Sequence, residues 1–380
     1  MTVIRNGLVF GAGGFAENDL AFDGGIITEI APAGTLNGDI YDAGGAYVTP
    51  GFIDIHTHGC VNSDFCDADP DGIEKMLAYY GRNGVTSVLL TTMSYGEEVL
   101  DSITRVALRY FGKKGYGAVL RGVNMEGPFI NEAKRGAQNP DYIMSPDASL
   151  FDRLNAAFGS NIRLLNLAPE LPGSIDLIRH AAKSCTVSIA HTTADYDCAS
   201  SAFAAGARNV THLFNAMPGF GHRAPGVVGA AFDAAEYVEI VSDGVHLHPS
   251  VVRAVFRMFG PRRVCLISDS IRGTGMPNGE YELGGQAIVI KDGRSNLVNG
   301  GAIAGSAMNL ADCFRQAVSF CVPLEDALRA ATFNPADSVS IAAETGSLEP
   351  GKDADILIMD AGLRLLDVFI GGERFESPET

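Results

Sequence analysis

Short apolar segments alternate with amphipathic segments through the middle of the chain. Strands are predicted at residues 85–90, 120–125, 162–167, 187–190, 209–211, 238–241 and 264–268. Helical periodicity falls between them, at residues 71–80, 97–110, 174–182, 196–205 and 249–258. Strands that are separated by helices pair in parallel and are buried on both faces of the sheet. With the apolar run that starts at Phe52 the count is eight, which favours a closed (β/α)8 TIM barrel over an open doubly wound sheet.

The two ends of the chain follow a different pattern. Residues 2–48 and the region after Gly351 consist of short alternating segments separated by Gly and Asn turns. We therefore predict a small β-sandwich domain formed by residues 1–50 and 348–380, with a barrel at residues 51–347 inserted between them. The Gly-rich span at about residues 271–300 ends in a hairpin-like segment and is predicted to be an insertion after the last barrel strand.

Composition and charge narrow the classes of partner. The 380 residues are 46% hydrophobic, which allows a large core, and the net charge of -17 argues against binding to nucleic acid. Neither a membrane-spanning apolar stretch nor a signal-peptide pattern is present, so a cytoplasmic protein is expected. Seven scattered cysteines without a CxxC pair indicate neither a disulfide framework nor a thiolate zinc site. An anionic substrate would need local cations or backbone N–H groups to offset the overall charge.

The apolar run of residues 50–59 ends in two histidines, His56 and His58. Side chains on a strand alternate between its faces, so these two imidazoles project from the same side and can reach one metal ion together. Taken alone the pair is weak evidence, because a buried histidine is more often hydrogen-bonded structure than a ligand.

Other polar residues also stand at the ends of apolar runs. Glu126 follows the third predicted barrel strand, His191 the fifth, His212 the sixth and Asp269 the eighth. In a (β/α)8 barrel the C-terminal ends of the strands meet at one rim, where the active site lies. One such residue could simply hydrogen-bond a loop, but six on one rim indicate a metal centre. Imidazoles and carboxylates suit zinc, iron, cobalt or manganese ions.

The motifs around these residues resemble those of the amidohydrolase superfamily, and more closely those of the N-acetylglucosamine-6-phosphate deacetylases. The least specific matches are residues 50–59 and Pro350-Gly351-Lys352-Asp353-Ala354-Asp355. The most specific are Glu126-Gly127-Pro128-Phe129 and His212-Leu213-Phe214-Asn215-Ala216-Met217. Asp243-Gly244-Val245-His246, Ser268-Asp269-Ser270 and Ile303-Ala304-Gly305-Ser306 match as well, so the resemblance covers nearly the whole chain.

This resemblance implies a chemical reaction and a cofactor. Glu126, His191 and His212 would hold the main divalent metal ion, and Asp269 would serve as acid and base. His56 and His58 would hold a second ion, but some members lack this pair, so the sequence leaves one or two ions open. Zinc is the first expectation, with iron, cobalt or manganese as alternatives. The reaction implied is hydrolysis of the acetamide of N-acetyl-D-glucosamine 6-phosphate by activated water, giving acetate and D-glucosamine 6-phosphate in amino-sugar metabolism.

The resemblance also implies substrate contacts. The residues concerned are Ala137, Gln138, Asn215, Ala216, Arg223, Asp243, His246, Ile303, Ala304 and Gly305. The phosphate would meet the backbone of Asn215 and Ala216 together with Arg223 and His246, and the segment 303–305 would lie on the acetyl side. Arg223 could instead be an exposed loop cation, and Asp243 could orient His246, bind a sugar hydroxyl or cap a turn. Family members can take phosphate contacts from a neighbouring subunit, so a homodimer is expected.

Gln138 departs from the family pattern, because many members carry a histidine at this position. A glutamine amide can donate a neutral hydrogen bond but cannot become a cation. Stabilisation of the developing oxyanion would then fall mainly on the metal.

Three alternatives stay open from the sequence. The substrate could be the galactosamine epimer, N-acetyl-D-galactosamine 6-phosphate. A cyclic-amide hydrolase of the same superfamily would share the His56–His58 segment, although such enzymes typically lack the motif at residues 212–217. A non-catalytic barrel scaffold is the third, and the presence of all six rim residues argues against it.

Overall fold

A barrel of parallel strands makes up most of the molecule in this computed structural model, which describes residues 1–375. The end of the predicted segment 348–380, residues 376–380, lies outside the described residues. The eight barrel strands pair in the order β15-β14-β13-β12-β11-β10-β9-β6. They are β6 (Phe52–Thr57), β9 (Val85–Thr91), β10 (Val119–Glu126), β11 (Ile162–Leu167), β12 (Thr186–Ile189), β13 (Asn209–Val210), β14 (Tyr237–Ile240) and β15 (Val264–Leu266).

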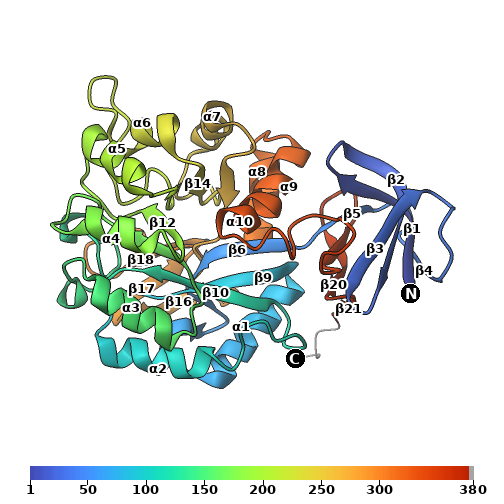
Figure 1. Ribbon diagram of the computed structural model, residues 1–380, viewed down its shortest axis with the longest axis horizontal. Helices are drawn as coiled ribbons and strands as arrows, with labels where there is room; N and C mark the ends of the chain where they lie inside the picture. The colour runs from blue at the N-terminus through green and yellow to red at the C-terminus, as the bar shows by residue number, and fades with distance from the viewer. Residues whose placement is uncertain (376–380) are drawn as a thin grey trace.

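Helices cover the outside of the barrel, as Figure 1 shows. They are α1 (Pro70–Arg82), α2 (Glu97–Ala107), α3 (Ala148–Ala157), α4 (Ser174–Ala181), α5 (Tyr196–Ala205), α6 (Gly226–Ala234), α7 (Pro249–Phe259), α8 (Leu310–Ser319), α9 (Leu324–Ala331) and α10 (Phe333–Ser338), with 3-10 turns η1 (Phe65–Asp67), η2 (Glu132–Lys134) and η3 (Pro140–Tyr142). Every side chain of β9 is buried, as a strand covered on both faces requires. The predicted (β/α)8 barrel is confirmed, although the helix predicted at residues 97–110 ends at Ala107.

The barrel closes where the segment after β15 meets β6. The Asp269 N–H donates to the His56 carbonyl at 2.9 Å, and the His58 N–H donates to the Ser270 carbonyl at 2.8 Å. The buried Asp54 carboxylate accepts from the N–H groups of His56 and Ser268, both at 3.3 Å. Burial raises the pKa of Asp54 to about 6. This closure brings Asp269 next to the two histidines that leave β6.

Strands from the two ends of the chain form a separate sheet beside the barrel. Its order is β21-β20-β19-β5-β1-β2-β3, with β4 paired to β1. The strands are β1 (Thr2–Gly11), β2 (Gly14–Asp23), β3 (Ile26–Pro32), β4 (Asp39–Asp42), β5 (Tyr47–Pro50), β19 (Ile356–Met359), β20 (Leu365–Ile370) and β21 (Glu373–Arg374). In Figure 1 the blue N-terminal strands and the red C-terminal strands lie together at one end of the molecule. Their own apolar core includes Leu20, Val48 and Ile356, which agrees with the predicted small β domain.

Two smaller sheets complete the structure. The predicted insertion forms the antiparallel strands β16 (Gly279–Leu283), β17 (Gln286–Lys291) and β18 (Arg294–Leu297). The short strands β7 (Gly59–Cys60) and β8 (Ser63–Asp64) form a hairpin directly after the histidines of β6. Within residues 1–375, no helix is both long enough and apolar enough to cross a membrane.

Candidate metal centre and substrate cavity

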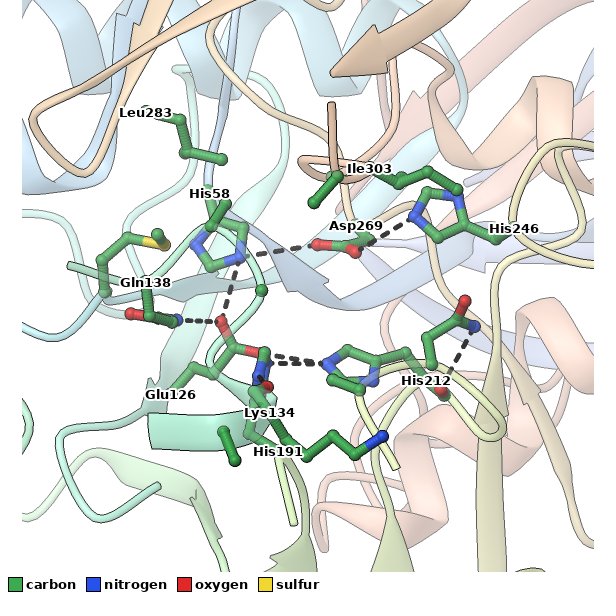
Figure 2. A pocket seen from close by; sticks show the side chains of 18 residues that line it. His58, Glu126, Lys134, Gln138, His191, His212, His246, Asp269, Leu283 and Ile303 are labelled. Carbon is green, nitrogen blue, oxygen red and sulfur yellow. Dashed lines mark hydrogen bonds and ion pairs between the residues drawn. The ribbon is translucent and has the colours of Figure 1, made fainter. Parts of the chain in front are cut away.

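A cavity of about 340 Å³ opens at the C-terminal ends of the barrel strands. Most of the predicted site residues line it, as Figure 2 shows. They are His58, Glu126, Ala137, Gln138, His191, His212, Asn215, Ala216, His246, Asp269, Ile303 and Gly305. Met93, Lys134 and Leu283 also line the cavity, and the sequence analysis did not single them out. They come from three separate segments, so no local pattern in the sequence would have grouped them.

Glu126 is the centre of the cluster of candidate metal ligands. Its Oε1 lies 3.1 Å from Nε2 of His191 and 3.2 Å from Nε2 of His212. The same oxygen is 3.4 Å from Nε2 of His56, whereas Oε2 is 3.4 Å from Nε2 of His58. Two groups result, each compact enough to hold one metal ion: Glu126 with His191 and His212, and Glu126 with His56 and His58.

Backbone geometry turns several of these side chains into the cavity. His191, His212 and Asp269 follow their strands with φ of 44°, 30° and 51°. Non-glycine residues rarely adopt this left-handed region, and they persist there only when the surrounding structure holds them. Each turn ends a strand abruptly and directs the side chain across the mouth of the barrel. The surrounding fold therefore holds these three side chains at the rim.

The donor set fits a divalent metal ion. The Nε2 atoms of His191 and His212 are only 3.2 Å apart and both face Glu126. Because His191 donates through Nδ1 to the Lys134 carbonyl, its neutral ring carries a lone pair at Nε2, and this lone pair and that of His212 can point at one cation. The buried Nε2 of His56 has no hydrogen-bond partner among residues 1–375, although it points at Glu126. Several imidazoles around a buried carboxylate are the ligand types that zinc and similar ions take.

The two carboxylates of the site are held in their charged form. Burial alone would raise the pKa of Glu126, but the imidazoles of His56 and His191 keep this pKa well below its ordinary value. Burial also opposes ionisation of Asp269, yet the hydrogen bond from His58 and the charge of His56 lower the pKa of Asp269 to about 2. Asp269 therefore faces the cavity as a negatively charged carboxylate.

Hydrogen bonds at the Nδ1 atoms orient two of the imidazole rings. His191 Nδ1 is 2.8 Å from the Lys134 carbonyl, which fixes that ring nitrogen as the donor. His56 Nδ1 is 3.3 Å from Oε2 of Glu239, and both side chains are fully buried. The sequence analysis missed Glu239. One signal could have found it, because an acidic residue interrupts the apolar strand Tyr237–Ile240.

A row of hydrogen-bonded polar side chains lies beside Asp269. His246 Nδ1 is 2.7 Å from Oδ2 of Asp243, and this carboxylate accepts from the Ser306 hydroxyl at 3.2 Å. Burial would lower the pKa of His246, but its hydrogen bond to Asp243 raises it above the ordinary value. Its Nε2 lies 3.9 Å from Oδ2 of Asp269. The cavity thus contains an imidazole whose protonation the adjacent Asp243 carboxylate favours.

The segment 303–306 passes very close to Asp269. Gly305 has φ of +59°, and a Cβ there would lie 2.9 Å from the Asp269 carbonyl oxygen and 2.5 Å from Ile271. Glycine is needed at this position for both reasons. The Ser306 N–H donates to the Asp269 carbonyl at 2.7 Å, which fixes the backbone of the catalytic candidate.

Four predicted residues do not line the cavity. His56, Asp243 and Ala304 are buried behind its wall. Arg223 is exposed, contacts Nε2 of His222 at 2.7 Å and lines a neighbouring hollow of about 540 Å³ beside the start of α5. Within one chain, therefore, the structure does not bring Arg223 to the metal cluster.

Known proteins resemble this chain over nearly its full length. The model of the family described as the amidohydrolase family matches residues 47–375. An N-acetylglucosamine-6-phosphate deacetylase of Lysinibacillus sphaericus is 34% identical over 96% of this chain and 95% of the relative. An N-acetylgalactosamine-6-phosphate deacetylase of Escherichia coli O157:H7 is 30% identical, covering 94% of each chain. The solved structure of N-acetylglucosamine-6-phosphate deacetylase from Pasteurella multocida superposes with a TM-score of 0.92 at 28% identity, covering 98% of this chain and 99% of that one.

Proposed function

The chain belongs to the amidohydrolase family, and we propose that it removes the acetyl group from N-acetyl-D-glucosamine 6-phosphate. The products are acetate and D-glucosamine 6-phosphate, so the protein is a carbon–nitrogen hydrolase of amino-sugar metabolism. One observation carries this proposal. A single cavity joins the Glu126 cluster, the Asp269 carboxylate and the backbone turn at residues 215–216, which is the set of groups that hydrolysis of an anionic amide needs.

A divalent metal ion is the cofactor, as in the rest of the family. Glu126, His191 and His212 would hold the main ion, and His56 and His58 would hold a second one together with Glu126. Zinc suits these ligands best, with iron, cobalt or manganese as alternatives. When bound, the ion supplies Lewis acidity, which makes water easier to deprotonate and polarises the amide carbonyl.

Asp269 performs the proton transfers. Its carboxylate accepts a proton as the water oxygen bonds to the acetyl carbon. It then gives this proton to the sugar nitrogen as the carbon–nitrogen bond breaks, so that the amine leaves in neutral form. Its position 3.5 Å from His58 Nε2 supports this role, because it places the carboxylate next to the metal ligands. Its unprotonated form leaves an oxygen free to accept a proton.

The net charge of -17 repels a sugar phosphate, and local groups in the cavity offset this repulsion. Asn215 and Ala216 line the cavity, and hydrogen bonding to Asp243 raises the pKa of His246, which also lines it. Asp243 holds that imidazole in place. On the acetyl side, Ile303 and Gly305 line the cavity, Ala304 supports them from behind, and Ala137 with Gln138 closes the opposite wall.

The position of Arg223 supports a homodimer. This side chain lies outside the cavity of its own chain, on an exposed loop, where it can act in the phosphate subsite of a neighbouring copy. A guanidinium can bind two phosphate oxygens at once. All seven cysteines, each within residues 1–375, are free thiols, which suits a cytoplasmic enzyme. Sedimentation of the purified protein would test the dimer, and a monomer at assay concentration would contradict it.

The galactosamine epimer is the second candidate substrate. It is favoured by the relative from Escherichia coli O157:H7, whose name specifies N-acetylgalactosamine 6-phosphate. The two sugars differ only in the configuration of one hydroxyl group, so the metal centre would treat them alike. Comparison of kcat/KM for the two phosphorylated sugars separates the candidates.

Acetate release tests the main proposal. Purified protein is stripped of metal, reloaded separately with zinc, iron, cobalt or manganese, and incubated with N-acetyl-D-glucosamine 6-phosphate. We expect acetate and free amine in equal amounts with at least one metal, and little activity toward the sugar without its phosphate. Absence of acetate with all four metals would refute the proposal.

A further inference from the structure

The Gln138 side chain is enclosed between two partners that fix the direction of its amide. Only 2% of the residue is exposed. Its Oε1 accepts a hydrogen bond from the Ser94 N–H at 2.7 Å, and its Nε2 donates to Oε2 of Glu126 at 2.7 Å. A backbone N–H can only donate and a carboxylate can only accept, so the reverse orientation of the amide would lose both bonds.

We propose that Gln138 is a positioning residue for Glu126 and sets which carboxylate oxygen binds the main metal ion. The amide occupies Oε2, and Oε1 is the oxygen that faces His191 and His212 at 3.1 and 3.2 Å. A hydrogen bond to one oxygen of a carboxylate leaves the other oriented as a single ligand atom. This inference rests on the metal site of the proposed function.

The same loop also orients His191. The Lys134 carbonyl accepts from His191 Nδ1 at 2.8 Å, only four positions before Gln138. Within the loop, the Gln138 N–H donates to the Arg135 carbonyl at 3.0 Å. Figure 2 shows Gln138 beside Glu126 and Lys134 beside His191. Residues 134–138 therefore preset two of the three main ligands, one through a backbone carbonyl and the other through a side-chain amide.

This role differs from a contact with substrate. Gln138 lines the cavity, so its second amide hydrogen is also able to meet the bound sugar. A residue that only contacts substrate would change KM or kcat and leave the affinity for metal as it was. A residue that positions Glu126 must change the affinity for metal in the absence of any substrate.

The decisive variant is Gln138→Met, which keeps the length of the side chain and removes its donor. Zinc affinity of the metal-free protein is measured by competition with a chelator, without substrate. We expect zinc to bind about 10- to 100-fold more weakly than in the wild type, the usual effect of losing an outer partner of a metal ligand. Excess zinc should then restore much of the lost acetate release.

Gln286→Met is the matched control. The Gln286 amide donates to the Ala137 carbonyl, next to Gln138, and within residues 1–375 it makes no hydrogen bond with Glu126. The substitution removes a contact to the same loop from outside the metal site. The zinc affinity of this variant should equal that of the wild type. If Gln138→Met does not fold, Gln138→Asn takes its place, because its shorter amide cannot span Ser94 and Glu126.

Three outcomes decide the inference. Weak zinc binding in a Gln138 variant with normal binding in Gln286→Met supports it. Wild-type affinity in Gln138→Met and Gln138→Asn, or equal weakening in the control, overturns it and leaves the proposed function standing. Failure of the wild type to bind zinc, iron, cobalt or manganese would overturn the proposed function and this inference with it.

Discussion

The two sides of the metal cluster share Glu126 but are built in different ways. His191 and His212 each follow a short strand with a left-handed backbone, and they come from two separate strands. His56 and His58 leave one strand together, and neither needs a left-handed backbone. One side is therefore set by loops at the rim, and the other by a strand within the barrel.

The hydrogen bonds that orient the ligand rings follow the same division. The ring of His191 is oriented by the carbonyl of Lys134 in a surface loop. The ring of His56 is oriented by the Glu239 carboxylate, which is fully buried inside β14. Changes in the loop should thus act on the first side and changes in the barrel interior on the second. The five substitutions below test this division.

Glu126→Ala should have the largest effect, because it removes the one ligand that both sides share. Without the carboxylate, each of the two groups would keep two imidazoles and lose its negatively charged ligand. We expect metal content to fall on both sides and acetate release to drop to the limit of detection. Elemental analysis and an acetate assay measure the two effects. Normal metal content in the variant would contradict the role of Glu126 as the shared ligand.

Asp269→Asn comes next and should separate chemistry from metal binding. Asp269 stands 3.5 Å from His58 and 3.7 Å from His56, so it belongs to the strand side by position. The amide keeps the shape but cannot take the proton from water. We expect the metal to stay bound while kcat falls by about 10²- to 10⁴-fold. Normal kcat would remove Asp269 from the mechanism, and loss of metal would make it a ligand.

His56→Ala and His191→Ala compare the two sides directly. His191 belongs to the group proposed for the main ion, whereas His56 belongs to the group proposed for the second. We expect His191→Ala to lose the main ion and nearly all activity, and His56→Ala to keep one ion with partial activity. Metal content per chain and kcat/KM of both variants provide the test. Equal losses in the two variants would mean that the sides act as one site.

Much of this division could be predicted from the sequence, because strand ends are local features. Apolar runs locate the strands, and in a barrel every strand delivers its last residue to the same rim. This reasoning predicts that Glu126, His191, His212 and Asp269 lie at one rim, and the structure brings them together. The fold class followed from the same alternation of strands and helices.

The contacts that orient the ligands could not be predicted, because they join segments far apart in the chain. The sequence predicts Gln138 as a substrate contact, whereas its bond to Glu126 depends on how the loop after β10 folds back. Met93 and Leu283 reach the cavity from the end of β9 and from the insertion. Glu239 lies in β14 and reaches His56 only because the barrel closes. Such pairs depend on tertiary packing.

Glu239→Gln should have the smallest effect and the most selective one. The amide keeps the size of the side chain and a hydrogen bond to His56 Nδ1, but removes a buried negative charge 3.3 Å from that ring. Burial would lower the pKa of His56, yet the carboxylates of Glu126 and Glu239 raise it well above its ordinary value.

Loss of the Glu239 charge makes the imidazole a weaker donor to metal, so affinity for the second ion should fall by about tenfold. Affinity for the main ion should not change, because within residues 1–375 Glu239 makes no side-chain hydrogen bond or ion pair with His191 or His212. Zinc titration followed by calorimetry resolves the two steps, and equal weakening of both would show that the barrel interior supports the whole cluster.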